Sequence, residues 1–157
     1  MAEPIAPDPF WNWQEGCALK AVYVDAARGS VEAQAQLAET ALGMTIAKAV
    51  DCKDGLATAI FWARVAVAHG RASDQLALAK LLHLWAALLF DEGNEQGSVM
   101  TQVEVIVILD RLADSGDDAA AETLSAHSSL LSKDAFTIAR QTQRAIDAAK
   151  GEEARWQ

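Results

Sequence analysis

The sequence predicts an all-α fold, a right-handed α-solenoid of antiparallel helix pairs with about seven helices. Three observations lead to this prediction. Apolar residues make up 52% of the 157 residues and charged residues 22%, which is typical of a packed domain. Helix-forming residues dominate the middle of the chain, whereas strand-forming runs are nearly absent. Glycines divide the chain into segments as long as ordinary globular helices.

Each expected helix lies between capping or helix-breaking signals. Ser30 and Ser73 are expected N-caps, because a serine hydroxyl can accept a hydrogen bond from a free amide of the first turn. Gly70, Gly116 and Gly151 stand where a left-handed C-cap belongs. The predicted helices span residues 14–28, 30–48, 54–69, 73–92, 99–115, 118–131 and 134–150.

The order helix, tight turn, helix recurs three times along the chain. Aligning the sequence on Gly29, Gly70 and Gly116 gives spacings of 41 and 46 residues. A leucine stands eight residues after each glycine, on the next expected helix; these are Leu37, Leu78 and Leu124. The repeat period predicts that the chain consists of three parts. They are a proline- and tryptophan-rich lead at 1–13, helical repeats at 14–131, and a C-terminal capping helix and tail at 132–157.

The middle repeat has the clearest pattern, because Ala59, Trp62 and Ala66 follow one another on a single helical face. Together with Gly70 and Leu78, these residues resemble the signature of the Sel-one-like repeats, a family of tetratricopeptide-type helical arrays. Departures from that signature occur at Val67, Asp74 and Ala63, the last standing where an aromatic often follows the tryptophan. The resemblance covers about residues 18–131 and implies a protein-binding scaffold without catalysis.

The net charge of −9 is concentrated in one part of the chain. Residues 91–122 contain nine acidic residues and one basic residue, Arg111. A field of this sign repels nucleic-acid phosphates, so we expect no direct nucleic-acid binding. Three interpretations remain open, namely a solubilising face, a surface for a basic protein or peptide, and an inhibitor that mimics nucleic acid to block a DNA-binding protein.

The residue types that carry catalysis or bind metals do not form a recognisable motif. Cys17 and Cys52 lie 35 residues apart without a neighbouring ligand, so we expect two buried thiols. His69, His83 and His127 belong to different expected helices and have no partner at metal-binding spacing. No phosphate loop, dinucleotide fingerprint or nucleophile elbow occurs. The sequence therefore predicts a protein that is not an enzyme and needs no metal or cofactor.

Two further observations bear on localisation. The first ten residues lack the basic start and apolar run of a signal peptide. The longest apolar stretch, residues 76–90, is interrupted by Lys80 and His83, whereas a membrane-spanning helix needs about 20 apolar residues. We therefore expect a cytoplasmic protein without membrane association.

A solenoid usually binds its partner along a concave wall built from one helix of each pair. If Leu37, Leu78 and Leu124 point into the array, the positions on the other side of these helices form the binding stripe. The predicted function is that of a non-enzymatic scaffold or adaptor that holds a protein or peptide in this groove. The predicted stripe contains Glu32, Gln36, Glu39, Ser73, Lys80, Leu84, Thr123 and His127.

The expected helix at 73–92 is apolar nearly all round, so more than one of its sides must be covered. Its outer side is expected to carry Leu81, Leu84 and Leu88. A patch of this kind seldom stays exposed on a monomer. Either residues 4–13 fold across it or a second copy packs there as a homodimer. Trp11, Trp13 and Trp156 are expected to cover the end helices of the array.

Overall fold

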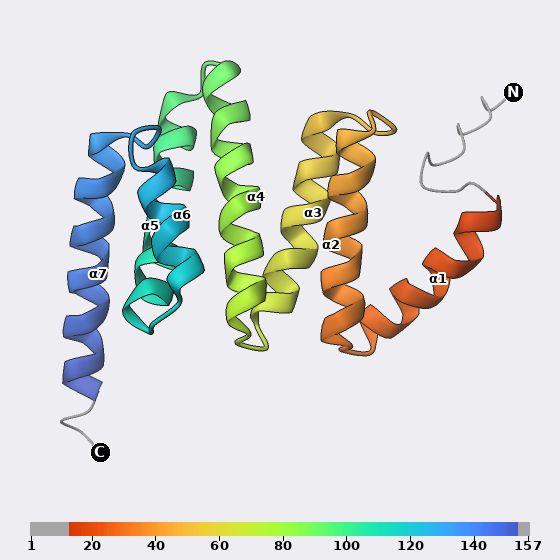
Figure 1. The fold of residues 1–157 in the computed structure, drawn as a ribbon, viewed down its shortest axis with the longest axis horizontal. Helices are drawn as coiled ribbons and strands as arrows, with labels where there is room; N and C mark the ends of the chain where they lie inside the picture. Colours follow the sequence, from red (N-terminus) through yellow and green to blue (C-terminus); the bar gives the residue numbers. More distant parts are fainter. Residues whose placement is uncertain (1–12, 154–157) are drawn as a thin grey trace, which may run out of the picture. The chain divides into compact units, whose positions relative to one another are not determined.

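The computed structural model describes the backbone of residues 13–153 and the side chains of residues 19–151. This part of the chain forms seven helices and no strand, which confirms the predicted all-α class (Figure 1). The helices are α1 (Trp13–Ala27), α2 (Val31–Ile46), α3 (Cys52–Val67), α4 (Ala72–Asp91), α5 (Glu95–Asp114), α6 (Asp118–His127) and α7 (Lys133–Glu153).

The capping residues explain where the helices begin. Ser30 caps α2 as predicted, because its Oγ accepts a hydrogen bond from the amide of Ala33 at 3.3 Å. The fifth helix begins four residues before its predicted start, at Glu95. The side chain of Asn94 causes this difference, since it accepts a hydrogen bond from the amide of Gly97 at 2.9 Å and so caps an earlier first turn.

The predicted N-cap at Ser73 is wrong. The N-cap of α4 is Arg71, and Ser73 lies inside the first turn. The guanidinium of Arg71 donates hydrogen bonds to both carboxylate oxygens of Asp74, at 2.6 and 3.1 Å. This two-point pairing keeps the buried Asp74 hydrogen-bonded.

Glycines end several of the helices in the predicted manner, with one exception. Gly70 and Gly116 have φ angles of +82° and +93°. These angles lie in the left-handed region, which residues with a β-carbon seldom adopt. The exception is Gly151, which lies within α7 and ends no helix. The predicted C-cap at Gly151 is therefore wrong, because α7 continues to Glu153.

The chain divides into two compact units, Met1–Gly70 and Arg71–Gln157. In the described part of the first unit, α1 packs against α2 and α2 packs against α3. The amide of Gln34 donates to the carbonyl oxygen of Ala26 at 3.0 Å, which fixes the turn between α1 and α2. An apolar cluster of the first unit contains the buried residues Ala26, Ala33 and Leu37, with Leu19, Val22, Tyr23 and Trp62 packed against it.

Helices α2 and α3 lie side by side, and the chain reverses direction between them (Figure 1). A β-carbon added at Gly55 would collide with the side chains of Thr45 and Val50. Further along α3, the small residues Ala59 and Ala66 are fully buried, in agreement with the pattern of small residues read from the sequence.

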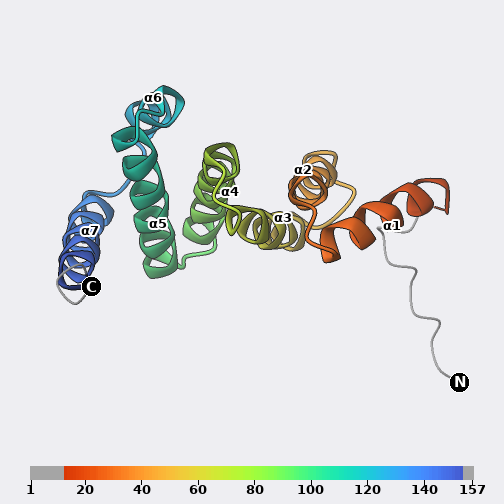
Figure 2. The same ribbon diagram turned by 90° about the horizontal axis from the view of Figure 1, so that it is seen from below.

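In the second unit, α5 lies between α4 and α7, while the shorter α6 also packs against α5 (Figures 1 and 2). One core cluster joins α5 to α7. It contains the buried residues Val103, Ile106, Leu131, Ala135 and Ala139. The alanines recur every four residues on α7, so this face of the helix can approach α5 closely. The cluster therefore sets the position of α7 and of the loop that precedes it.

Two sequence predictions about exposure are wrong. Leu81 is only 4% exposed and belongs to the core, so it cannot form part of an outer apolar patch with Leu84 and Leu88. Cys52 is exposed rather than buried, because it is the first residue of α3 and faces solvent there. The side chain of Cys17 lies outside the described residues, as do those of Trp11, Trp13 and Trp156 and the whole segment 4–12.

Candidate functional site

A chain of hydrogen bonds connects α4, α5 and the start of α7 in the second unit. The hydroxyl of Ser98 donates to the carbonyl oxygen of Ala86 at 2.7 Å. Gln102 Nε2 then donates to Ser98 Oγ at 3.2 Å, and Gln102 Oε1 accepts from the amide of Ser132 at 2.7 Å. These bonds hold three segments of the chain at fixed separations and so define the space between them.

That space is an open groove with a volume of about 610 Å³, within the usual range for binding pockets. Its deepest residues are small or buried, notably Ala86 and Ser98. Two large apolar residues at the groove are mostly exposed, since Phe90 is 60% and Leu130 68% accessible. The full lining comprises His83, Ala86, Ala87, Phe90, Asp91, Glu95, Ser98, Val99, Gln102, Leu130, Leu131, Ser132 and Asp134.

The charged side chains of the groove are all acidic. Asp91, Glu95 and Asp134 are exposed carboxylates, and none of the described residues that line the groove is a lysine or an arginine. Glu95 and Asp134 lie in the first turns of α5 and α7, where a negative charge stabilises the helix. Asp91 is instead the last residue of α4, where the helix dipole disfavours an anion.

Two histidines from different helices meet at the groove, and their spacing in the sequence does not predict this contact. The rings of His83 on α4 and His127 on α6 are 4.5 Å apart between centroids, at an interplanar angle of 70°. His127 Nδ1 lies 2.8 Å from the carbonyl oxygen of Thr123, so this nitrogen carries a proton and donates. His83 Nδ1 is buried without a hydrogen-bond partner. Burial, and secondly the neighbouring His127, lower the pKa of His83.

The lowered pKa of His83 predicts a loss of stability in mild acid. The unfolded chain binds a proton at His83 more readily than the folded chain does, so stability falls as the pH drops below the ordinary histidine pKa of about 6.5. His83→Phe keeps an aromatic ring beside His127 and removes the titration. Urea unfolding at pH 7.5, 6.5 and 5.5 should show a smaller loss of stability for this variant, and an equal loss would contradict the assignment.

The predicted binding stripe is divided between the two units. Glu32, Gln36 and Glu39 are exposed on successive turns of α2 in the first unit. Ser73, Lys80 and Leu84 are exposed along α4 in the second unit, Leu84 being 46% accessible. Each set thus shares one face of its helix, as the spacing predicted. Their use by a partner stays a prediction.

The third part of the stripe, on α6, is already engaged within the protein. Thr123 and His127 are half-buried, and their hydrogen bond joins the side chain of His127 to the backbone one turn earlier. The ring of His127 also packs against His83. Leu124, expected to point inwards, is partly buried against the core cluster between α5 and α7.

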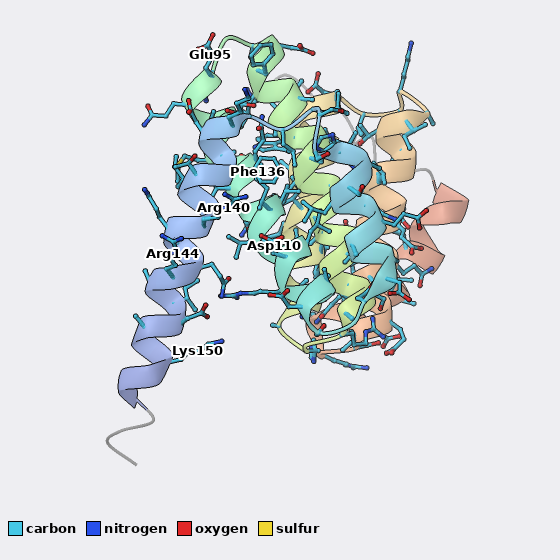
Figure 3. The ribbon with its side chains drawn as sticks, turned by 60° about the vertical axis from the view of Figure 1, so that its left-hand side comes forward. Glu95, Asp110, Phe136, Arg140, Arg144 and Lys150 are labelled. Atoms are coloured by element: carbon cyan, nitrogen blue, oxygen red, sulfur yellow. The ribbon has the colours of Figure 1, made fainter. Side chains whose placement is uncertain are left out.

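The acidic residues at 91–122 extend from the end of α4 along α5 and onto α6. Glu95 is the first residue of α5 and Asp114 the last; a helix of 20 residues is about 30 Å long. Figure 3 shows Glu95 at one end of α5 and Asp110 much further along it, beside α7. Burial and the nearby Asp114 raise the pKa of Asp110, while the positive charge of Arg140 on α7 opposes this shift.

Several of these acids have local roles at helix starts. Asp117 is the N-cap of α6, with its Oδ1 accepting from the amide of Ala120 at 3.0 Å. Asp118 follows in the first turn of the same helix, where a negative charge is stabilising. The concentration of acids along the sequence therefore reflects capping as well as surface charge.

Among the residues whose side chains are described, no group of three or more His, Cys, Asp or Glu is arranged to hold a metal ion. None of the helices, over the same part of the chain, is long and apolar enough to cross a membrane.

Comparisons with known proteins find no relative of the chain. No protein-family model matches it, and neither the curated proteins nor the solved structures provide a match.

Proposed function

We propose that the protein is a non-enzymatic protein-interaction module, and that the groove between α4, α5 and the start of α7 holds a segment of its partner. One observation carries this proposal. Phe90 and Leu130 are large apolar residues, both mostly exposed, beside a floor that includes Ala86 and Ser98. Exposed apolar surface next to a recess is a common feature of protein-binding sites.

The dimensions of the groove suit a small number of anchoring side chains. Burying one large apolar side chain contributes about 1.5–3 kcal/mol, and a few such anchors carry most of the affinity of many interfaces. The hydrogen bonds through Ser98 and Gln102 fix the groove before the partner arrives. Less ordering free energy is then lost on binding than with a flexible site.

The resemblance to Sel-one-like repeats supports the same class of function. A right-handed solenoid of antiparallel helix pairs, and a role as scaffold or adaptor, belong to this proposal. The exposed free thiol of Cys52 favours a reducing compartment, so we propose that the protein acts in the cytoplasm. The net charge of −9 favours a partner with basic residues.

The alternatives receive less support. A nucleic-acid mimic needs carboxylates at phosphate-like spacing across one surface, whereas several acids of residues 91–122, among them Glu95, Asp117 and Asp118, cap helices or lie in their first turns. A homodimer through Leu81, Leu84 and Leu88 was predicted from an exposed patch of these three leucines. It receives less support because Leu81 is buried.

Blocking the groove tests the proposal. Peptides that bind the full-length protein are selected from a random 12-residue display library, and their affinities are measured by fluorescence anisotropy. Ala87 is exposed and lines the groove, so Ala87→Trp fills it without disturbing the core. We expect this variant to weaken peptide binding by tenfold or more.

Ala119→Trp is the matched control, because Ala119 is exposed on α6 away from the groove lining. It should leave the affinities unchanged. Failure to select any binding peptide, or equal affinities for the wild type and Ala87→Trp, would contradict the proposal.

A further inference from the structure

We propose that the groove selects a positively charged segment, in which an aromatic or aliphatic anchor is flanked by arginine or lysine. This inference rests on the proposed function and names the chemistry of the partner. The apolar part of the groove provides a place for the anchor. The carboxylates of Asp91, Glu95 and Asp134 supply the preference for basic flanks.

The groove remains negative after the helix dipoles are counted. Asp91, Glu95 and Asp134 contribute three negative charges without a lysine or arginine in the described lining. The starts of α5 and α7 each contribute about half a positive charge, and the end of α4 about half a negative charge. The sum stays at about two and a half negative charges, so an approaching cation is attracted.

Asp91 is the most informative of the three acids. Glu95 and Asp134 are explained by their places in helix first turns, but Asp91 ends α4, where an anion destabilises the helix. Glu92, the C-cap, adds a second acid at the same end. A cationic partner side chain at this end of α4 would offset the unfavourable position of Asp91.

The neighbourhood of Asp91 also suits the shape of basic side chains. Phe90 precedes it, lines the groove and is mostly exposed. Arginine and lysine carry long apolar stems that lie along apolar surface while the charged head stays near water and carboxylates. An arginine can in addition stack its planar head on an aromatic ring. Phe90 therefore suits the apolar stem of a basic side chain, and Asp91 suits its charged head.

Three end-blocked tripeptides test the charge preference with a constant anchor: arginine–tryptophan–arginine, glutamine–tryptophan–glutamine and glutamate–tryptophan–glutamate. Their affinities for the full-length protein are measured by NMR titration. We expect the arginine peptide to bind at least tenfold more tightly than the glutamate peptide. The ratio should shrink between 0.01 M and 1 M salt, as the Debye length falls from about 30 Å to about 3 Å.

Neutral variants locate the preference. The triple variant Asp91→Asn, Glu95→Gln, Asp134→Asn should bring the three affinities within about twofold of one another. The matched control Asp114→Asn, Asp118→Asn, Glu122→Gln removes the same charge from the end of α5 and from α6, outside the groove lining, and should keep the full preference. If the first triple variant folds poorly, Asp91→Asn alone serves, because removing an anion from the C-terminal end of a helix does not weaken the helix.

The outcomes separate this inference from the proposed function. If Ala87→Trp weakens all three peptides but the arginine and glutamate peptides bind the wild type equally well, the groove binds peptides and the charge preference is wrong. If the control triple variant loses the preference as fully as the groove variant, the attraction is general and the inference is also wrong. If Ala87→Trp changes no affinity, the proposed function itself fails.

Discussion

Replacing Ile106 with alanine is expected to lower the free energy of unfolding by about 2–5 kcal/mol, the usual cost of truncating a fully buried isoleucine. Ile106 is 1% exposed and packs in the cluster that joins α5 to α7. The variant loses the transfer free energy of the deleted methyl and methylene groups. It also leaves a cavity that the small residues Ala135 and Ala139 cannot fill.

Urea unfolding followed by circular dichroism measures this loss. Ile106→Val deletes only one methylene group at the same position and should cost about 0.5–1.5 kcal/mol. A loss below about 1 kcal/mol for Ile106→Ala would mean that the packing of α7 on α5 contributes little to stability. The position of the groove wall at Leu131 and Asp134 would then need another explanation.

Gln102→Ala is expected to cost about 1–3 kcal/mol, because it leaves a partly buried amide without its partner. The amide of Ser132 loses its acceptor, and Ser98 loses a donor at the same time. The loop at Leu130 and Leu131 should then become more mobile. Peptide affinity should fall with stability, since the groove is no longer fixed before binding.

Thr101→Ala is the control for Gln102→Ala. Thr101 lies next to it on α5, but its hydroxyl bonds only to the carbonyl oxygen of Gly97 in its own helix, at 2.9 Å. We expect a change in unfolding free energy below about 0.5 kcal/mol, because alanine's better helix propensity offsets that bond. Equal effects of the two substitutions would show that the hydrogen bond to Ser132 does not hold the groove together.

Local signals in the sequence predicted most of the helices. Ser30 and the glycines at Gly70 and Gly116 act within one or two turns, so their effect on the backbone can be inferred from neighbouring residues alone. Ser73 failed as a predicted N-cap because Arg71 and Asp74 pair across the same turn. A local rule was overridden there by a side-chain interaction that it does not include.

The groove could not be predicted in the same way. Its hydrogen-bond chain joins Ala86, Ser98, Gln102 and Ser132, which are brought together only by the packing of α4, α5 and α7. The same is true of the contact between His83 and His127. Phe90 was the one residue in the sequence that could have indicated the groove, since it is the last apolar residue of its helix and directly precedes two acids.

The most direct test of the central claim is to locate a bound peptide on the ¹⁵N-labelled full-length protein by chemical-shift mapping. The arginine–tryptophan–arginine tripeptide serves as the probe. If the groove binds the peptide, the largest amide shifts fall within residues 86–102 and 130–134, around the groove. Largest shifts at the alternative stripe, around Gln36 on α2 and Lys80 on α4, would contradict it, as would shifts spread evenly over the chain.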